Sequence, residues 1–376
     1  MDKRSAIVIG AGIVGLATAR ALALKGFSVQ VLDRTQKAVG ASIRNFGMLW
    51  PIGQPAGKLY DRAIRSRNIW EEICNDANIW HDPVGSLHVA YHQDEWNILE
   101  ELYEIFSGQG RQVELLGKNE IADKSGAVVE KNLLGGLYSR EELIVDPREA
   151  IWALPGYLAE KWGITFHWGK CVSYISNQTV YVGNEEEYEA DMIFICSGID
   201  LETLYPEYFL QYPLTKCKLQ MMRLAAQPNE WRIGPALCGG LSLIHYSSFK
   251  AAPSLPKLKL RYQEEMSDYI EWGIHVMVSQ NGKGELTVGD SHEYGLTHDP
   301  FDKKFINDLI LDYLKKFASF KDWTLIESWN GIYPKLTDGE TDLFFSPEPA
   351  VYILNGVGGA GMTLSFGLAE ELVAGI

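Results

Sequence analysis

The first apolar run of the chain reads Ala6-Ile-Val-Ile-Gly10-Ala-Gly12-Ile-Val-Gly15, and an acid, Asp33, closes the next apolar run. Gly10 permits a tight turn after a strand, Gly12 lets the backbone approach a pyrophosphate, and Gly15 lets the following helix pack closely on the sheet. The pattern stands between a predicted strand and a predicted helix, the context that a dinucleotide site requires. We therefore predict a β-α-β unit with a pyrophosphate at the helix N-terminus and Asp33 at the adenosine ribose. The pattern alone does not separate FAD from NAD.

Composition limits the classes of protein to which the chain can belong. Its 376 residues suggest two domains, at about 150 residues per domain. A net charge of −15 repels nucleic acid and anionic lipid, so we expect neither as a partner. No apolar run is long enough for a transmembrane segment, and the first strand begins at once, so we expect a cytoplasmic protein. The five cysteines are odd in number and lack metal-ligand spacing with histidine, so we expect reduced thiols and no metal.

The predicted elements alternate between helices and strands. Helices are predicted at 12–25, 58–77, 94–106, from 147 towards 161, at 301–317 and at 364–374. Strands are predicted at 6–9, 28–32, 85–90, 164–168, 171–175, 179–182, 190–196, 219–224, 241–246, 273–279, 285–288 and 351–354. Residues 34–57 form a long connection rich in Gly and Pro, and a connection of this length inside a compact domain is usually functional.

A second glycine-rich turn, residues 356–363, joins the last strand to the last helix. If the C-terminal segment folds back on the first unit, both turns belong to one cofactor site. The second helix N-terminus would then stabilise the negative charge that develops at the N1/O2 edge of a reduced flavin. A nicotinamide has no such need, so this turn favours FAD; a simple tight turn is the alternative.

Taken together, these motifs resemble the D-amino-acid oxidase, glycine oxidase and sarcosine oxidase family of flavoenzymes over essentially the whole chain. Further carriers of the resemblance are Ala41-Ser42 with Gly47-Met48, Asp146-Pro147-Arg148, Cys196-Ser197-Gly198 and the run from Trp329 to Pro334. The resemblance implies an α/β fold, α+β overall, with a Rossmann-like FAD-binding domain and an antiparallel-sheet substrate domain. The FAD-binding domain would comprise 1–80, 146–210 and 326–376, and the substrate domain 81–145 and 211–325. The flavin ring would lie at their junction.

The resemblance also implies which residues hold FAD. They are Gly10, Gly12, Ile13, Val14 and Gly15 at the pyrophosphate; Asp33 and Arg34 at the adenosine; Ser42 at a phosphate; Arg44, Asn45, Phe46, Gly47, Met48 and Leu49 along the isoalloxazine; Val172 at the adenine; Gly358, Gly359, Ala360, Gly361, Met362 and Thr363 over the N1/O2 edge; and Ser197, Gly198 and Gly331 elsewhere in the site.

Three positions depart from the family pattern. Sarcosine oxidases hold the flavin through a cysteine where this chain has Gly331, so we expect noncovalent FAD. Glycine and D-amino-acid oxidases place a carboxylate-binding arginine where Tyr333 stands, and sarcosine oxidases use a lysine where Thr363 stands. The chain therefore either binds a carboxylate differently or does not take a simple amino acid.

The run Ser42-Ile-Arg-Asn-Phe-Gly-Met-Leu-Trp-Pro-Ile-Gly-Gln54 resembles a narrower subgroup, associated with phosphonate utilisation, that oxidises aminophosphonates such as N-methyl-2-aminoethylphosphonate. A phosphonate dianion needs at least two cationic groups or strong donors. The residues alone leave the candidates open: Arg44, Lys216, Lys218, Arg223, His245 and Lys335. Met48 and Trp50 are expected in the pocket wall.

The reaction implied is oxidation of the C–N bond of a small amine: hydride transfer to flavin N5, hydrolysis of the imine, and reoxidation by O2 or another acceptor. Tyr246 and Tyr333 would orient the substrate and His245 would help to deprotonate it, although each can equally be a core residue. The alternatives left open are a D-amino-acid, glycine or sarcosine type oxidase or dehydrogenase, a quinone-linked dehydrogenase, an NAD-dependent dehydrogenase and a flavoprotein without turnover.

Overall fold

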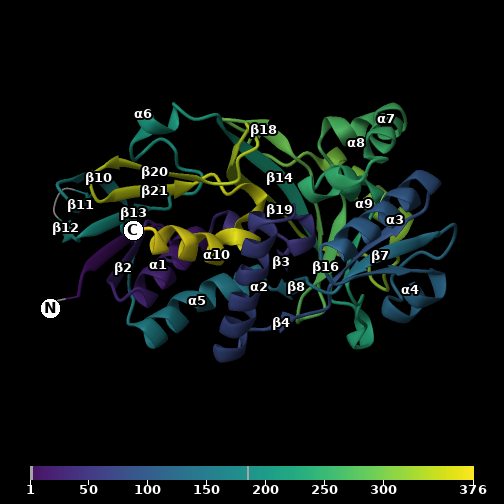
Figure 1. Ribbon diagram of the computed structural model, residues 1–376, viewed down its shortest axis with the longest axis horizontal. Helices are drawn as coiled ribbons and strands as arrows, with labels where there is room; N and C mark the ends of the chain where they lie inside the picture. Colours follow the sequence, from purple (N-terminus) through teal and green to yellow (C-terminus); the bar gives the residue numbers. More distant parts are fainter. Residues whose placement is uncertain (1–2, 184–185) are drawn as a thin grey trace.

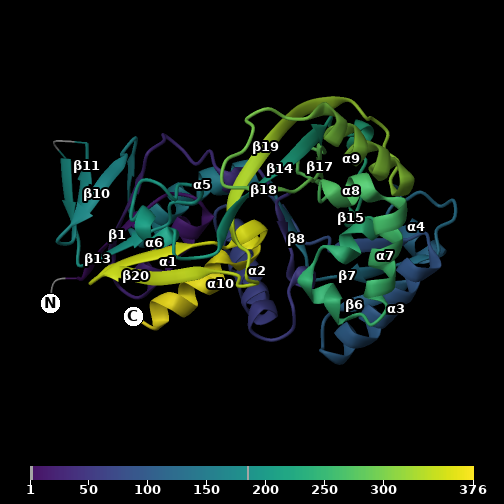
Figure 2. The same cartoon turned by 90° about the horizontal axis from the view of Figure 1, so that it is seen from above.

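The computed structural model describes residues 3–183 and 186–376. A mainly parallel sheet with its helices lies on one side of the molecule, and a larger, mostly antiparallel sheet lies on the other (Figures 1 and 2). This arrangement confirms the predicted fold class. None of the helices in the described part of the chain combines the length and the apolar character that a bilayer crossing needs.

The mainly parallel sheet carries the predicted β-α-β unit. Its order is β20 (Leu343–Glu348), β21 (Val351–Asn355), β13 (Met192–Ile195), β1 (Ser5–Ile9), β2 (Ser28–Asp33) and β9 (Thr165–Trp168). All neighbours pair in parallel except β20, which is antiparallel to β21. Ala6, Ile7 and Val8 are completely buried. The continuous apolar run of β1 is what a parallel strand covered on both faces requires.

Four helices pack around this sheet: α1 (Ile13–Leu24), α2 (Lys58–Asp76), α5 (Pro147–Trp162) and α10 (Gly361–Ala374). Helix α10 packs on α1 and α2, so the C-terminal segment folds back on the first unit as predicted (Figure 1). The carboxylate of Asp146 caps α5 by accepting from the amide of Arg148 at 2.9 Å, which confirms the predicted helix start.

Two small antiparallel sheets accompany the parallel one. The first contains β10 (Val172–Ser176), β11 (Thr179–Val182) and β12 (Glu186–Glu189), and the second contains β3 (Met48–Leu49), β8 (Leu143–Val145) and β4 (His81–Asp82). Strand β3 lies in the long connection, which also contains the 3₁₀ turns η1 (Ala41–Ile43) and η2 (Pro51–Gly53). The connection is therefore ordered and packed between the two halves.

The larger sheet has the order β18 (Glu293–Gly295), β14 (Leu214–Leu224), β17 (Leu286–Gly289), β16 (Met277–Gln280), β15 (Ala236–Cys238), β5 (Ser86–Ala90), β7 (Gly135–Ser139) and β6 (Val113–Leu116). Strand β19 (Leu325–Leu336) pairs with β14 over its whole length. The predicted domain boundary at residue 326 therefore falls within a strand of the larger sheet, and the division into domains stays a prediction.

The remaining helices are α3 (Gln93–Gly108), α4 (Lys118–Lys124), α6 (Pro206–Phe209), α7 (Leu255–Glu265), α8 (Ser267–Glu271) and α9 (Lys304–Phe317). The strand predicted at 241–246 is wrong, because the 3₁₀ helix η4 (Gly240–Ile244) occupies this segment. A Cβ at Gly240 would lie 2.3 Å from the hydroxyl of Tyr262, so tertiary packing of the turn overrides the apolar pattern. The strand predicted at 273–279 begins only at Met277.

Candidate functional site

The glycine-rich turn between β1 and α1 has the geometry that the motif predicts. Gly10 has φ +107°, and a Cβ there would lie 2.3 Å from the carbonyl oxygen of Cys196. A Cβ at Gly15 would lie 1.8 Å from the carbonyl oxygen of Gly10. Both positions therefore require glycine, and the N-terminus of α1 sits directly against the end of the sheet.

Polar side chains surround this helix N-terminus. The hydroxyl of Ser42 accepts from the amide of Ile13 at 2.9 Å. The carboxylate of Asp33 accepts from the amide of Ala11 at 2.8 Å and from the amide of Thr35 at 2.8 Å. Ser42 therefore lies where a phosphate would meet α1, and Asp33 fixes the turn itself. The neighbouring Arg34 forms an ion pair with Asp200, which raises the pKa of Arg34.

Polar contacts hold the long connection, residues 34–57, in place. The side chain of Asn45 accepts from the amide of Gly47 at 2.8 Å. Gly47 has φ +72°, and a Cβ there would lie 1.9 Å from the carbonyl oxygen of Val145, so only glycine fits. The carbonyl oxygen of Phe46 accepts from the hydroxyl of Ser279 in the other half. These contacts hold the segment predicted to run along the isoalloxazine at the junction of the two halves.

Asn355, at the end of β21, joins two of the predicted cofactor turns. Its Nδ2 donates to the carbonyl oxygen of Gly198 at 3.0 Å and to the hydroxyl of Ser197 at 3.3 Å. Its Oδ1 accepts from the amide of Gly356 at 2.7 Å. The sequence does not single out Asn355 as a site residue; the only local signal is a polar side chain that ends a buried strand before a glycine. The turn continues through η6 (Gly358–Ala360) into Gly361 and Met362 at the start of α10.

A second group of predicted residues meets near the start of α10. The hydroxyl of Thr363 accepts from the amide of Trp50 at 3.0 Å. The Trp50 ring lies 6.0 Å from that of Tyr246, whose hydroxyl donates to the sulfur of Met277 at 3.2 Å. Trp50 and Met48 are buried, and burial raises the pKa of Tyr246. Thr363, Trp50 and Tyr246 therefore lie together near the start of α10.

Tyr333 faces the second glycine-rich turn. A Cβ at Gly359 would lie 3.2 Å from the Tyr333 hydroxyl, and Tyr333 is only 9% exposed. Burial beside the Cys217 thiol, across the β14–β19 ladder, raises its pKa. A Cβ at Gly331, two residues earlier, would lie 3.0 Å from the carbonyl oxygen of Arg44. Val172, which was predicted to lie at the adenine, is buried at the start of β10.

The structure separates the candidate anion-binding side chains. Lys216 pairs with Glu202, Lys218 donates to the carbonyl oxygens of Asp299 and Phe301, and Arg223 pairs with Glu285. These three cations already have partners in the fold.

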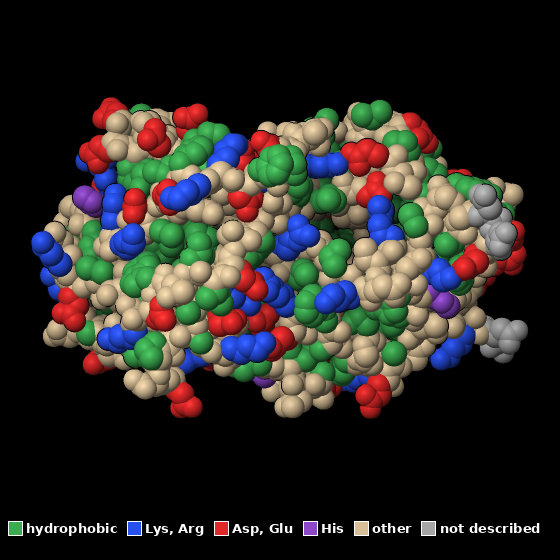
Figure 3. Space-filling view, turned by 180° about the vertical axis from the view of Figure 1, so that it is seen from behind, with side chains coloured by type: hydrophobic (Ala, Val, Ile, Leu, Met, Phe, Trp, Pro, Cys, Tyr) green, Lys and Arg blue, Asp and Glu red, His purple; other side chains and the backbone are tan. Residues whose placement is uncertain are grey.

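Arg44 and Lys335 lie in different places. Arg44 donates to the carbonyl oxygen of Asn330 at 3.1 Å and lines a hollow with Arg148 and Trp329. Lys335 lies 3.5 Å from the hydroxyl of Tyr294, and its charge contributes to lowering the pKa of His245. The hollow beside Arg44 is thus lined by residues other than His245, whereas Lys335 lies close to His245. Figure 3 shows the surface hollowed near the middle of one face, with Lys and Arg side chains around the hollow.

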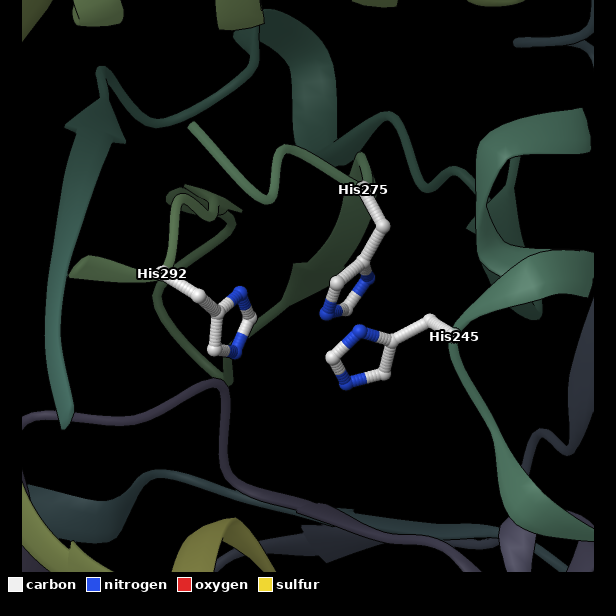
Figure 4. Close-up of side chains that lie close together, drawn as sticks. All are labelled: His245, His275 and His292. Atoms are coloured by element: carbon white, nitrogen blue, oxygen red, sulfur yellow. The ribbon is translucent and has the colours of Figure 1, made fainter. Parts of the chain in front are cut away.

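Three histidines, His245, His275 and His292, converge near Lys335 (Figure 4). One nitrogen from each ring lies within 4.8 Å of the others. Asp290, also buried, approaches His275 Nε2 at 3.0 Å. Of these residues only His245 could be named as a candidate from the sequence, because the three histidines come from separate segments with no recognisable spacing.

A dinucleotide cofactor fits the first part of this site. The turn at Gly10 has no room for side chains, the helix N-terminus of α1 lies against it, and the Ser42 hydroxyl stands beside the helix amide of Ile13. Backbone amides at a helix N-terminus bind phosphate groups. The turn that ends at Thr363 supplies a second helix N-terminus at the junction.

Known proteins share this architecture. The chain matches glycine oxidase from Geobacillus kaustophilus with a TM-score of 0.76 and 20% identity, covering 99% of this chain and 94% of that one. Iminodiacetate oxidase from Chelativorans sp. BNC1 gives a TM-score of 0.74 and 19% identity, with coverages of 99% and 94%. At these identities the likeness shows the fold.

A sequence relative, glycerol 3-phosphate dehydrogenase from Caloramator mitchellensis, is 24% identical over 198 residues, which are 51% of this chain and 41% of the relative. The chain thus spans less than half the length of that relative. The family model described as FAD dependent oxidoreductase matches residues 5–374. The chain therefore belongs to the family of FAD-dependent oxidoreductases.

Proposed function

We propose that this protein oxidises the C–N bond of a small amine that carries an anionic group, with an aminophosphonate as the substrate class. The observation that carries the proposal is a group of polar side chains around Lys335, which pairs through its backbone with Val357 in the second glycine-rich turn. Tyr294 lies beside Lys335, and the three histidines are close enough for its charge to act on His245 and His292. This group offers a cation and several polar nitrogens to an anion larger than a carboxylate. The family resemblance implies that Tyr333 and Thr363 replace the carboxylate-binding cations of glycine, D-amino-acid and sarcosine oxidases.

When bound, FAD supplies the acceptor for the hydride equivalent that leaves the carbon next to the amine nitrogen. Gly10, Gly12, Ile13, Val14, Gly15 and Ser42 would hold its pyrophosphate, and the turn from Gly358 to Thr363 would meet the ring. We propose that FAD is noncovalent, since Gly331 offers no thiol. Precipitating the protein with trichloroacetic acid should release all flavin into the supernatant; flavin that stays in the pellet would contradict this.

The protein's own residues position the amine. The buried Trp50 and Met48 would exclude water from one side, and the hydroxyls of Tyr246 and Tyr333 would orient the nitrogen. The neighbouring ring of His292 and the charge of Lys335 lower the pKa of His245. We assign His245 to the group that meets the anion and not to the proton transfer expected from the sequence, because its nitrogen lies within 4.8 Å of nitrogens of His275 and His292.

Anaerobic bleaching of the flavin tests the substrate class. We expect N-methyl-2-aminoethylphosphonate to bleach the purified holoenzyme rapidly, and air to restore the yellow colour with release of hydrogen peroxide. N-methyl-β-alanine, which replaces the phosphonate by a carboxylate at the same distance, is the matched control. Sarcosine, glycine and D-alanine test the alternative that the substrate is an amino acid with a carboxylate, which the glycine oxidase and iminodiacetate oxidase folds favour. Faster bleaching by a carboxylate than by the phosphonate would overturn the proposal.

A further inference from the structure

The three histidines reach one point from three segments. His245 follows η4, His275 precedes β16 and His292 follows β17 (Figure 4). Their ring centroids are 3.7 Å apart for His245 and His275, 4.7 Å for His245 and His292, and 5.1 Å for His275 and His292. His275 and His292 are 3% and 6% exposed, whereas His245 is open to solvent. The cluster therefore has a buried floor and one accessible side.

The ring separations favour neutral imidazoles. Three cationic rings this close together would repel one another strongly. A neutral imidazole carries one nitrogen with a free lone pair, which is the form in which histidine ligates a metal.

Neighbouring polar groups orient the two buried rings, His275 and His292. The Nδ1–H of His292 donates to the carbonyl oxygen of Gly273 at 2.9 Å, which leaves Nε2 as the lone-pair nitrogen. Nδ1 of His275 is buried with no hydrogen-bond partner among the described residues. Asp290 lies 3.0 Å from Nε2 of His275 and 3.8 Å from Nε2 of His292. A carboxylate and a backbone carbonyl behind metal-binding imidazoles are the usual means of fixing their orientation.

Packing alone gives no reason for this arrangement. A buried polar atom without a partner costs about 1–3 kcal/mol, and Nδ1 of His275 is such an atom. A cation between the rings would satisfy the lone pairs and offset the carboxylate. Tetrahedral zinc with Zn–N distances of about 2.0–2.1 Å places its ligands about 3.3 Å apart. The three nitrogens lie within 4.8 Å of one another, so each pair would close by at most about 1.5 Å on binding zinc.

We propose that His245, His275 and His292 bind one divalent transition-metal ion, zinc above all, and that an oxygen of the substrate's anionic group completes its coordination. Three imidazoles with an open position form the common ligand set of such zinc sites. Lys335, beside the cluster, would attract the same anion. The choice of anion rests on the proposed function, whereas the metal site does not.

Metal content tests the site without reference to activity. The tag-free holoenzyme should contain about one metal ion per chain by plasma mass spectrometry, or should bind one Zn²⁺ per chain in calorimetry after EDTA dialysis. The variants His275→Gln and His292→Gln should bind Zn²⁺ about 100-fold more weakly or worse. His298→Gln is the matched control, since His298 contacts the carbonyl of Lys216 and lies outside the cluster. No saturable binding by the wild type, or equal binding by all variants, would overturn the proposal.

A second measurement needs no variant. Co²⁺ added to the EDTA-treated protein should give the d–d absorption of four-coordinate cobalt, at wavelengths longer than those of oxidised flavin. Methylphosphonate, which cannot be oxidised at a C–N bond, should shift these bands. Weak six-coordinate bands alone would overturn the site, and bands unchanged by methylphosphonate would overturn the role of the anion. Flavin bleaching by the amine is scored separately, so the metal site and the proposed function can fail independently.

Discussion

Replacing Gly15 by alanine tests the cofactor turn at its tightest contact. The new Cβ would lie 1.8 Å from the carbonyl oxygen of Gly10, whereas real Cβ atoms essentially never approach closer than 3.0 Å. The helix α1 must therefore move from the turn by about 1.2 Å. Overpacking of this kind costs about 1–3 kcal/mol of stability. The same shift moves the helix amides away from a bound pyrophosphate, and each hydrogen bond lost to a charged group costs about 1.5–3 kcal/mol.

The assay compares flavin content and melting temperature. For Gly15→Ala we expect FAD affinity to fall about tenfold to a hundredfold and the melting temperature to fall by about 2–4 °C for each kcal/mol lost. Gly156→Ala is the matched control. Gly156 lies inside α5 with no atom within 4 Å of an added Cβ, so alanine there should stabilise the helix by up to about 1 kcal/mol. A Gly15→Ala protein that keeps its flavin and melts with the wild type would refute the close-packing argument.

Three further changes have defined outcomes. Tyr333→Phe should slow turnover and leave flavin content unchanged; unaltered kcat and KM would exclude an orienting role for this hydroxyl. Burial raises the pKa of Glu142 to about 7 from an ordinary value of 4.5, so the folded protein binds more protons than the unfolded chain between those values, and its stability falls as pH rises through them. Glu142→Gln should remove this loss, by at most about 1.4 kcal/mol per pH unit, in urea denaturation at several pH values. Asp146→Ala removes the cap of α5 and a bond from Asn281 at 3.0 Å, and should cost about 1–3 kcal/mol, whereas Asp146→Asn should cost less.

The sequence predicted those parts of the fold that local chemistry determines. The β1–α1–β2 unit follows from glycine spacing and apolar periodicity, and the start of α5 follows from Asp146 followed by Pro147. The prediction failed at residues 241–246, where an apolar pattern typical of a strand forms a 3₁₀ helix, because Gly240 packs against Tyr262. Local pattern cannot anticipate such tertiary packing.

The candidate site also contains a part that the sequence predicts and a part that it does not. The phosphate-binding turn could be predicted because one short segment contains all its parts. The cluster of His245, His275 and His292 could not, since three distant segments supply it and each histidine alone resembles a core residue. Likewise, Asn355 joins two turns that only the folded sheet brings together.

The packing of α10 on α1 has a consequence for how the protein matures in the cell. On the proposed assignment, the first and the last turns of the chain both contribute to the flavin site. A nascent chain still lacking its last residues would expose the face of α1 that α10 covers. Flavin loading should therefore wait until α10 has been synthesised and has packed on α1, and translation products cut short before Gly361 should accumulate as colourless protein.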